Sequence, residues 1–269
     1  MKTVSDSIVV AIRRIASVAD KVCRGEAILK RALFAIVLSG FQFGCATIQQ
    51  PAKDCMPAFF DGARILFQGD SITDGNRGRN ADPNHILGHG YQFIIAAKYG
   101  DDLANRNLTF INRGISGNKV SDLARRWPTD TIDLKPDVLS ILVGVNDLNY
   151  GVPAEDYERQ YDQLLADTVK ALPNVRLVLG EPFGLPVAGK KNDWDQYRAR
   201  LIERDEIVNR LGLKYHAPVV HYQKLFEAAA RRAPAEHWIW DGIHPTYSGH
   251  QLMADEWVRT VRACWPSPK

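Results

Sequence analysis

Short, mostly apolar runs alternate with longer stretches of helical period along the chain from Ala63 onward. When helices cover both faces of a parallel sheet, its strands have near-continuous apolar sequences of this kind. The alternation therefore predicts an α/β fold, a three-layer α/β/α sandwich with a central parallel sheet. The expected strands are residues 65–67, 108–111, 138–143, 175–179 and 219–220.

Two of the longer stretches place large apolar residues on one face of a helix. Such a stripe predicts a helix that packs against the sheet. The first stripe comprises Trp194, Tyr197, Leu201, Val208 and Leu211, and the second Met253, Trp257 and Val261.

Polar residues with catalytic potential lie where the expected strands end. Ser71 follows the first strand, Gly117 the second and Asn146 the third, while Asp241 and His244 lie in the loop before the last helix. In an open α/β sheet, ligands bind beyond the carboxyl ends of the strands. We therefore expect these five residues to converge on one edge of the sheet.

A serine hydroxyl is a weak nucleophile unless a histidine base and a carboxylate assist it. Asp241 lies three residues before His244, so a single turn brings its carboxylate to Nδ1 and leaves Nε2 for Ser71. These three residues are the predicted catalytic group. Two alternatives remain open: Ser71 as a helix N-cap, and His237, Asp241, His244 and His250 as metal ligands. We expect no metal, because the serine partner is present.

Four segments resemble, in order and in type, the four sequence blocks of the SGNH hydrolase (GDSL esterase) superfamily. The resemblance runs from Ala63 to the C-terminus and is closest to the bacterial serine acetylxylan esterases. It implies a flavodoxin-like fold and a serine esterase without a cofactor, which acts on acetyl esters of carbohydrate through an acyl-enzyme. The segments are 69–75 (GDSITDG), 112–118 (NRGISGN), 144–147 (GVND) and 240–245 (WDGIHP).

The resemblance also implies an oxyanion hole, formed by the N–H groups of Ser71 and Gly117 and by the side-chain amide of Asn146. Trp240 and Asp70 are candidate substrate contacts, although Trp240 also fits a lid over the core. Asp70 also fits, with Asp74, a role in holding the loop through backbone N–H groups.

Substrate identity stays open at this stage. Arg77 and Arg79 face either an anionic or uronic-acid substrate or solvent. The alternative functions are a lysophospholipase- or thioesterase-type lipid acyl hydrolase and a non-catalytic carbohydrate-binding relative.

The charge of the chain argues against large polyanionic partners. The 34 basic and 31 acidic residues leave a formal net charge of +3, which gives no electrostatic footprint for nucleic acid or anionic membrane. The expected partner is a small-molecule or oligosaccharide ester, with no nucleic acid and no stable membrane span.

Residues 1–46 have the pattern of an export signal. Lys30 and Arg31 precede an uncharged apolar run over residues 32–44. Because a membrane-spanning helix needs ~20 apolar residues, the run fits a signal-peptide core better. Cleavage is expected after Ala46, or before Cys45 in a lipoprotein. A buried core helix or an interfacial anchor is the alternative.

The expected organisation is a leader (1–46), a linker (47–62) and a catalytic domain (63–269), in a protein that is secreted or periplasmic. Cys55 and Cys264 lie near the two ends of the catalytic domain. In an oxidising compartment they are positioned to form a disulfide, with two unrelated thiols as the alternative.

Overall fold

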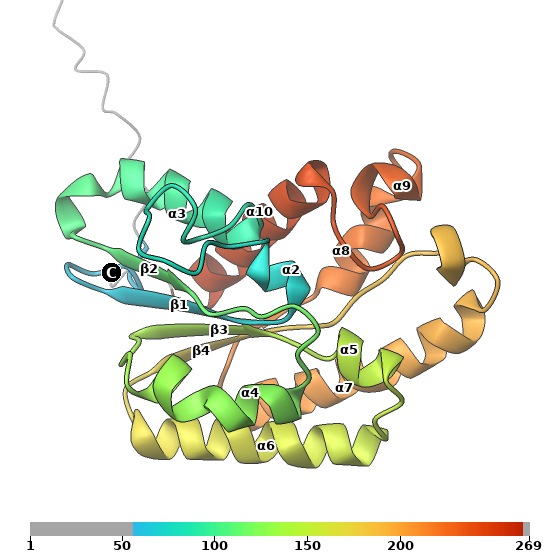
Figure 1. Ribbon diagram of the computed structural model, residues 1–269, viewed down its shortest axis with the longest axis horizontal. Coiled ribbons are helices and arrows are strands. Elements are labelled where there is room, and N and C mark those ends of the chain that lie inside the picture. The colour runs from blue at the N-terminus through green and yellow to red at the C-terminus, as the bar shows by residue number, and fades with distance from the viewer. Residues whose placement is uncertain (1–55, 266–269) are drawn as a thin grey trace, which may run out of the picture. The chain divides into compact units, whose positions relative to one another are not determined.

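The computed structural model describes residues 56–265, which contain a five-stranded parallel sheet in the order β2-β1-β3-β4-β5. All five strands lie where the apolar runs predict them, and Figure 1 shows helices on both sides of the sheet. The α/β/α prediction is therefore confirmed. The strands are β1 (Arg64–Gly69), β2 (Thr109–Asn112), β3 (Val138–Leu142), β4 (Arg176–Gly180) and β5 (Val219–Val220).

The longer helices form the two outer layers. α3 (Tyr91–Asp102), α8 (Tyr222–Ala229) and α10 (Tyr247–Cys264) cover one face of the sheet. α4 (Val120–Trp127), α6 (Ala154–Ala171) and α7 (Trp194–Lys214) cover the other (Figure 1). The shorter helical segments are α2 (Ser71–Asp74), η1 (Ala104–Arg106), η2 (Pro128–Ile132), α5 (Val145–Asn149), η3 (Ala188–Lys190) and α9 (Ala235–Trp238).

Both predicted helical stripes face the core. In α7, Tyr197, Leu201, Val208 and Leu211 are buried and Trp194 is partly buried; in α10, Met253, Trp257 and Val261 are buried. The indole N–H of Trp257 donates to the Ser140 hydroxyl of β3 over 3.0 Å. This bond satisfies the one polar group of each side chain inside an apolar layer.

The strand register places the carboxyl ends of β2, β1 and β3 close together at one edge of the sheet. Gly69, the last residue of β1, pairs with Leu142, the last residue of β3. Asn112, the last residue of β2, pairs with Phe67 of β1. The segments that follow these three strands therefore leave the sheet side by side, as the sequence predicts.

The prediction of a linker over residues 47–62 is wrong for the part that begins at Met56. Met56, Ala58 and Phe59 are fully buried, and the Phe59 ring lies 5.1 Å from that of Tyr99 and 6.2 Å from that of Trp257. Burying this apolar segment against α3 and α10 removes it from water, so the folded unit begins at least as early as Met56. The leader lies outside the described residues.

Two further expectations concern the ends of the domain. Cys264 is exposed in the last turn of α10, whereas Cys55 lies outside the described residues, so their pairing stays a prediction. Within residues 56–265, no helix is both long and apolar enough to cross a membrane.

Candidate active site

Ser71, His244 and Asp241 form one hydrogen-bonded chain at the carboxyl edge of the sheet. The Ser71 Oγ lies 2.8 Å from Nε2 of His244, and Nδ1 of His244 lies 2.6 Å from Oδ2 of Asp241. Because a carboxylate only accepts, Nδ1 carries the proton and Nε2 is left to accept from the Ser71 hydroxyl. Ser71 and His244, which are 173 positions apart in the sequence, thus meet as the motifs predict.

Asp241 also shapes the loop that carries His244. Its Oδ1 accepts the backbone N–H groups of Ile243 (3.1 Å) and His244 (2.8 Å). Burial raises the pKa of Asp241, but these bonds and the His244 ring outweigh burial and hold the pKa below its ordinary value. The carboxylate is therefore charged and holds the imidazole in one orientation.

Asp70, and not Ser71, caps the short helix α2. The Asp70 Oδ1 accepts the N–H of Ile72 over 3.0 Å, and the side chain is 1% exposed. Burial raises the pKa of Asp70 to about 7. The expectation that Asp70 contacts substrate is therefore wrong, because the capping bond turns its carboxylate into the protein. Its other expected role, holding the loop, is the one observed.

The approach to Ser71 requires glycine. Gly69 has φ +156°, and a Cβ there would lie 2.2 Å from the carbonyl oxygen of Leu142 in β3. A larger residue would push the two strands apart at the point where α2 begins. Glycine therefore lets Ser71 emerge directly from the sheet edge.

Gly117 and Asn146 lie in the two neighbouring segments, after β2 and β3. Gly117 adopts a left-handed conformation with φ +82°. Asn146 lies in α5, and its Nδ2 donates to the carbonyl of Asn118 over 3.1 Å. Since an amide nitrogen has two hydrogens, one donor of Asn146 remains available for another acceptor. The two segments are thus tied together beside the helix that carries Ser71.

Trp240 presents an open aromatic face beside the histidine. Its side chain is 63% exposed. The ring lies 6.3 Å from the His244 ring with an angle of 26° between the planes. Its backbone N–H donates to the His244 carbonyl, which fixes the start of the loop. The indole therefore lies exposed to solvent beside the His244 ring.

The other histidines of this region have separate environments. His250 is buried in α10, where its Nδ1 accepts the N–H of Tyr91, and burial lowers its pKa to about 4. His237 lies in α9, with its ring edge-on to Trp238. Among the described residues, no group of three or more His, Cys, Asp or Glu side chains could hold a metal ion.

Sequence reasoning missed one buried carboxylate. Asp147 follows Asn146 in the GVND segment and is fully buried. Its two oxygens accept the N–H of Val120 at the start of α4 (3.2 and 3.3 Å). Burial raises the pKa of Asp147 to about 6. The GVND motif does contain Asp147, so the sequence marks the position. It does not show that the carboxylate is buried, because its partner, Val120, lies 27 residues away in the sequence.

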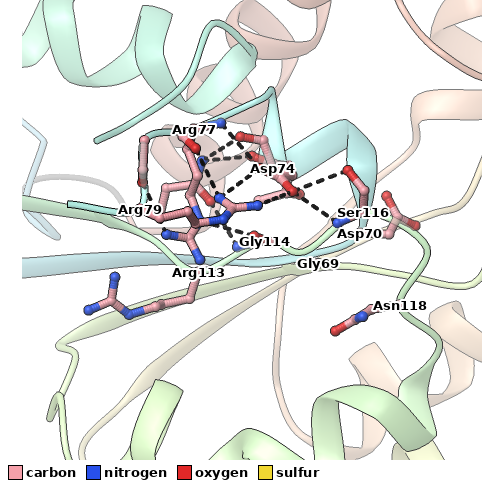
Figure 2. Close-up of polar contacts among 12 residues, drawn as sticks. Gly69, Asp70, Asp74, Arg77, Arg79, Arg113, Gly114, Ser116 and Asn118 are labelled. Carbon is pink, nitrogen blue, oxygen red and sulfur yellow. Dashed lines mark hydrogen bonds and ion pairs between the residues drawn. The ribbon is translucent and has the colours of Figure 1, made fainter. Parts of the chain in front are cut away.

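The two arginines after Ser71 bond to the protein itself (Figure 2). Arg77 Nε donates to the carbonyl of Gly114 over 3.0 Å. Arg79 pairs with Asp74 through both of its terminal nitrogens, at 3.0 and 2.7 Å. From the sequence, we expect the two arginines to face either substrate or solvent. Both instead make hydrogen bonds within the protein.

Comparison with known proteins is consistent with this geometry. An α/β/α sandwich with a serine, a histidine and an aspartate linked at its carboxyl edge is typical of hydrolases. The chain belongs to the GDSL-like lipase/acylhydrolase family, whose sequence model matches residues 67–252. It is 28% identical over 216 residues to an acetylxylan esterase of Geobacillus stearothermophilus, covering 76% of this chain and 96% of the relative.

Solved structures give the same result. A protein described as a GDSL-like lipase from Parabacteroides merdae has a TM-score of 0.71 and 38% identity, covering 75% of this chain and 96% of that one. The crystal structure of the G. stearothermophilus acetylxylan esterase Axe2 has a TM-score of 0.67 and 27% identity, covering 76% and 96%. The protein is therefore a carboxylic ester hydrolase.

Proposed function

We propose that the protein is a serine esterase that removes acetyl groups from carbohydrate through an acyl-enzyme. The observation that carries the proposal is the 2.8 Å contact between Ser71 Oγ and the free Nε2 of His244. The 28% identity to an acetylxylan esterase supports the choice of acyl group and of carbohydrate.

The proposed reaction follows from the hydrogen bonds of the site. Ser71 Oγ attacks the ester carbonyl carbon while His244 Nε2 takes its proton, and Asp241 stabilises the imidazolium that forms. When the tetrahedral intermediate collapses, Nε2 returns the proton to the leaving alcohol. Water then attacks the acetyl-serine with His244 again as base, which releases acetate and restores Ser71.

The oxyanion in this proposal is held by the N–H groups of Ser71 and Gly117 and by the unused amide hydrogen of Asn146. Each such donor contributes ~3 kcal/mol to the transition state when water is excluded. No metal or other cofactor takes part in the proposed steps.

Trp240 is the proposed contact for the sugar. Pyranose rings have apolar faces that pack on aromatic rings, and the Trp240 indole is open beside His244. A carbohydrate substrate also fits an exported protein, and we propose that residues 1–46 are the leader that directs export. Cys45 offers a lipoprotein anchor as the variant of that proposal.

The lipid-hydrolase alternative differs in the length of acyl chain that the site accepts. The segment between α2 and α3 is rich in polar residues, and most of it is exposed or partly exposed, so it offers little apolar surface for a long chain. Each methylene that finds no apolar surface forgoes ~0.8 kcal/mol of burial.

A series of nitrophenyl esters from acetyl to octanoyl tests the proposal. Activity should fall steeply from acetyl to butyryl and be negligible at octanoyl, and Ser71→Ala should remove it without unfolding the protein. Rates that climb toward octanoyl would favour the lipid hydrolase. A folded Ser71→Ala enzyme with substantial turnover would contradict the serine mechanism. An inactive wild-type protein that still binds xylooligosaccharide would favour the carbohydrate-binding relative.

A further inference from the structure

One buried carboxylate, that of Asp74, gathers bonds from three neighbouring residues beside the nucleophile. Asp74 is the last residue of α2, three positions after Ser71, and is 2% exposed. Its Oδ2 accepts the N–H and the hydroxyl of Ser116 (2.9 and 3.1 Å) and one Arg79 nitrogen (2.7 Å). Its Oδ1 accepts the other Arg79 nitrogen and the Arg77 N–H (3.0 and 3.1 Å).

These bonds connect the two segments that the proposed reaction needs in register (Figure 2). Ser116 directly precedes Gly117, whose N–H is a proposed oxyanion donor. Since the peptide unit is planar, that N–H points in a direction set by the backbone of Ser116. The carboxylate of Asp74 therefore acts on the orientation of the donor through one intervening residue.

Hydrogen bonds hold the turn at Gly117, and one of them closes the turn itself, from the Asn118 N–H to the Ile115 carbonyl over 3.2 Å. Apart from its two chain neighbours, no described residue has an atom within 4 Å of the place where a Cβ on Gly117 would be. Side-chain packing therefore does not hold its left-handed conformation, and hydrogen bonds hold both ends of the turn instead. Asp74 bonds Ser116 on one side, and on the other Arg126 Nε donates to the Asn118 side chain over 2.9 Å.

Arg79 makes a charged carboxylate stable in this buried place. Burial alone would raise the pKa of Asp74, but the bonds from Arg79, Ser116 and Arg77 outweigh it and hold the pKa below its ordinary value. A charged Asp74 has enough lone pairs to accept from Ser116 and Arg79 together. An asparagine that keeps its oxygen toward Ser116 presents an NH2 group, itself a donor, to the Arg79 nitrogen and the Arg77 N–H that Oδ1 accepts, and it carries no charge to pair with Arg79.

We propose that Asp74, with Arg79 as its counter-ion, is a positioning residue that holds the oxyanion turn at Gly117 in register with Ser71. The inference rests on the proposed esterase function. It assigns no contact with substrate to Asp74, so its effect belongs to the chemical step and not to substrate binding.

The test compares Asp74→Asn with wild type in kcat and KM for nitrophenyl acetate. Loss of a whole oxyanion donor lowers kcat by about 10²- to 10³-fold, so a misplaced donor is expected to lower kcat by about 10- to 100-fold. KM should stay within about twofold, and the shape of the pH profile should be unchanged because His244 is untouched. Asp82→Asn, at a partly exposed carboxylate of the following loop, is the matched control and should match wild type.

Substitutions of Arg79 give a second, independent test. Its side chain is 53% exposed, so Arg79→Ala is expected to fold even where Asp74→Asn does not. Arg79→Ala should lower kcat by about 3- to 10-fold with KM unchanged, and Arg79→Lys should restore part of the loss by keeping the charge.

Each outcome decides the inference. A folded Asp74→Asn enzyme with wild-type kcat, or an Arg79→Ala enzyme with wild-type kcat, would overturn it. A loss that appears in KM alone would also overturn it. Failure of the proposed function has a different signature, since the wild-type protein would then lack Ser71-dependent turnover in the same assay.

Discussion

The carboxylate of Asp241 has two separate tasks, one for each oxygen. Oδ2 accepts from His244 Nδ1, while Oδ1 accepts the backbone N–H groups of Ile243 and His244. An asparagine at this position keeps an oxygen for the backbone bonds but presents an amide hydrogen to the imidazole. The loop should therefore keep its shape while the histidine changes its tautomer.

Asp241→Asn is expected to lower kcat on the order of 10⁴-fold, because a histidine held with its proton on Nε2 cannot accept from Ser71. Steady-state kinetics on nitrophenyl acetate measure the loss, and a melting temperature within a few degrees of wild type shows that the loop is intact. A loss of only a few-fold would mean that another carboxylate orients His244.

Single residues also mark the limit of what the sequence can predict. Ser71, Asp241 and His244 were predictable because short motifs carry them and their chemistry requires one another. The environment of Asp70 was not, since burial depends on how distant segments pack. The same holds for Asp74, whose partner Ser116 lies 42 residues further along the chain.

At the scale of elements, α2 and the loop after β2 meet through their backbones. A Cβ on Gly114 would lie 2.4 Å from the backbone nitrogen of Asp74 and 2.7 Å from the carbonyl carbon of Thr73. The Nδ2 of Asn112 donates to the carbonyl of Thr73 over 2.7 Å. At Gly114 the helix that carries Ser71 thus lies directly against the backbone of the loop.

Gly114→Ala is expected to separate these two elements. Because the obstructing atoms are backbone, the clash cannot be relieved by a side-chain rotation, and overpacking of this kind costs ~1 to 3 kcal/mol. For a domain of this size that lowers the melting temperature by about 2 to 12 °C, and kcat should fall with it.

Gly100→Ala is the matched control for this prediction. Gly100 lies in α3, and outside its own helix no described residue has an atom within 4 Å of the position that an alanine methyl would occupy. Alanine favours a helix over glycine, so this variant should melt at or slightly above the wild-type temperature. Equal behaviour of the two variants by calorimetry would argue against a close contact between α2 and the loop.

Element positions were more predictable than element contacts. The apolar runs located all five strands because a strand that helices cover on both faces requires an apolar sequence. The stripes in α7 and α10 were predictable for the same reason. The segment from Met56 to Phe59 was not, because the prolines around it indicate a linker while its burial depends on partners such as Trp257.

At the scale of the whole molecule, one buried carboxyl makes stability depend on pH. Asp205 of α7 is 9% exposed, and its Oδ1 has no hydrogen-bond partner among residues 56–265. Burial raises its pKa to about 9. The neighbouring Glu181, Glu227 and Glu206 contribute to the rise, whereas Arg198 opposes it.

This shift destabilises the fold at neutral and alkaline pH. Above its ordinary pKa of 3.8 the Asp205 carboxyl ionises in the unfolded chain, but in the folded chain it keeps its proton until about pH 9. The folded state therefore binds one more proton across that interval, and the free energy of unfolding falls as pH rises through it.

Asp205→Asn should remove this pH dependence, because asparagine has nearly the same shape and no proton to lose. At pH 8 the variant is expected to melt at least about 3 °C above wild type, roughly the effect of 1 kcal/mol in a domain of this size. The difference should shrink toward zero as the pH approaches 4. Melting curves at several pH values measure it, with Asp255→Asn, at an exposed position of α10, as the control. A wild-type melting temperature that rises between pH 5 and 8 relative to the variant would mean that Asp205 is ionised and paired in the folded protein.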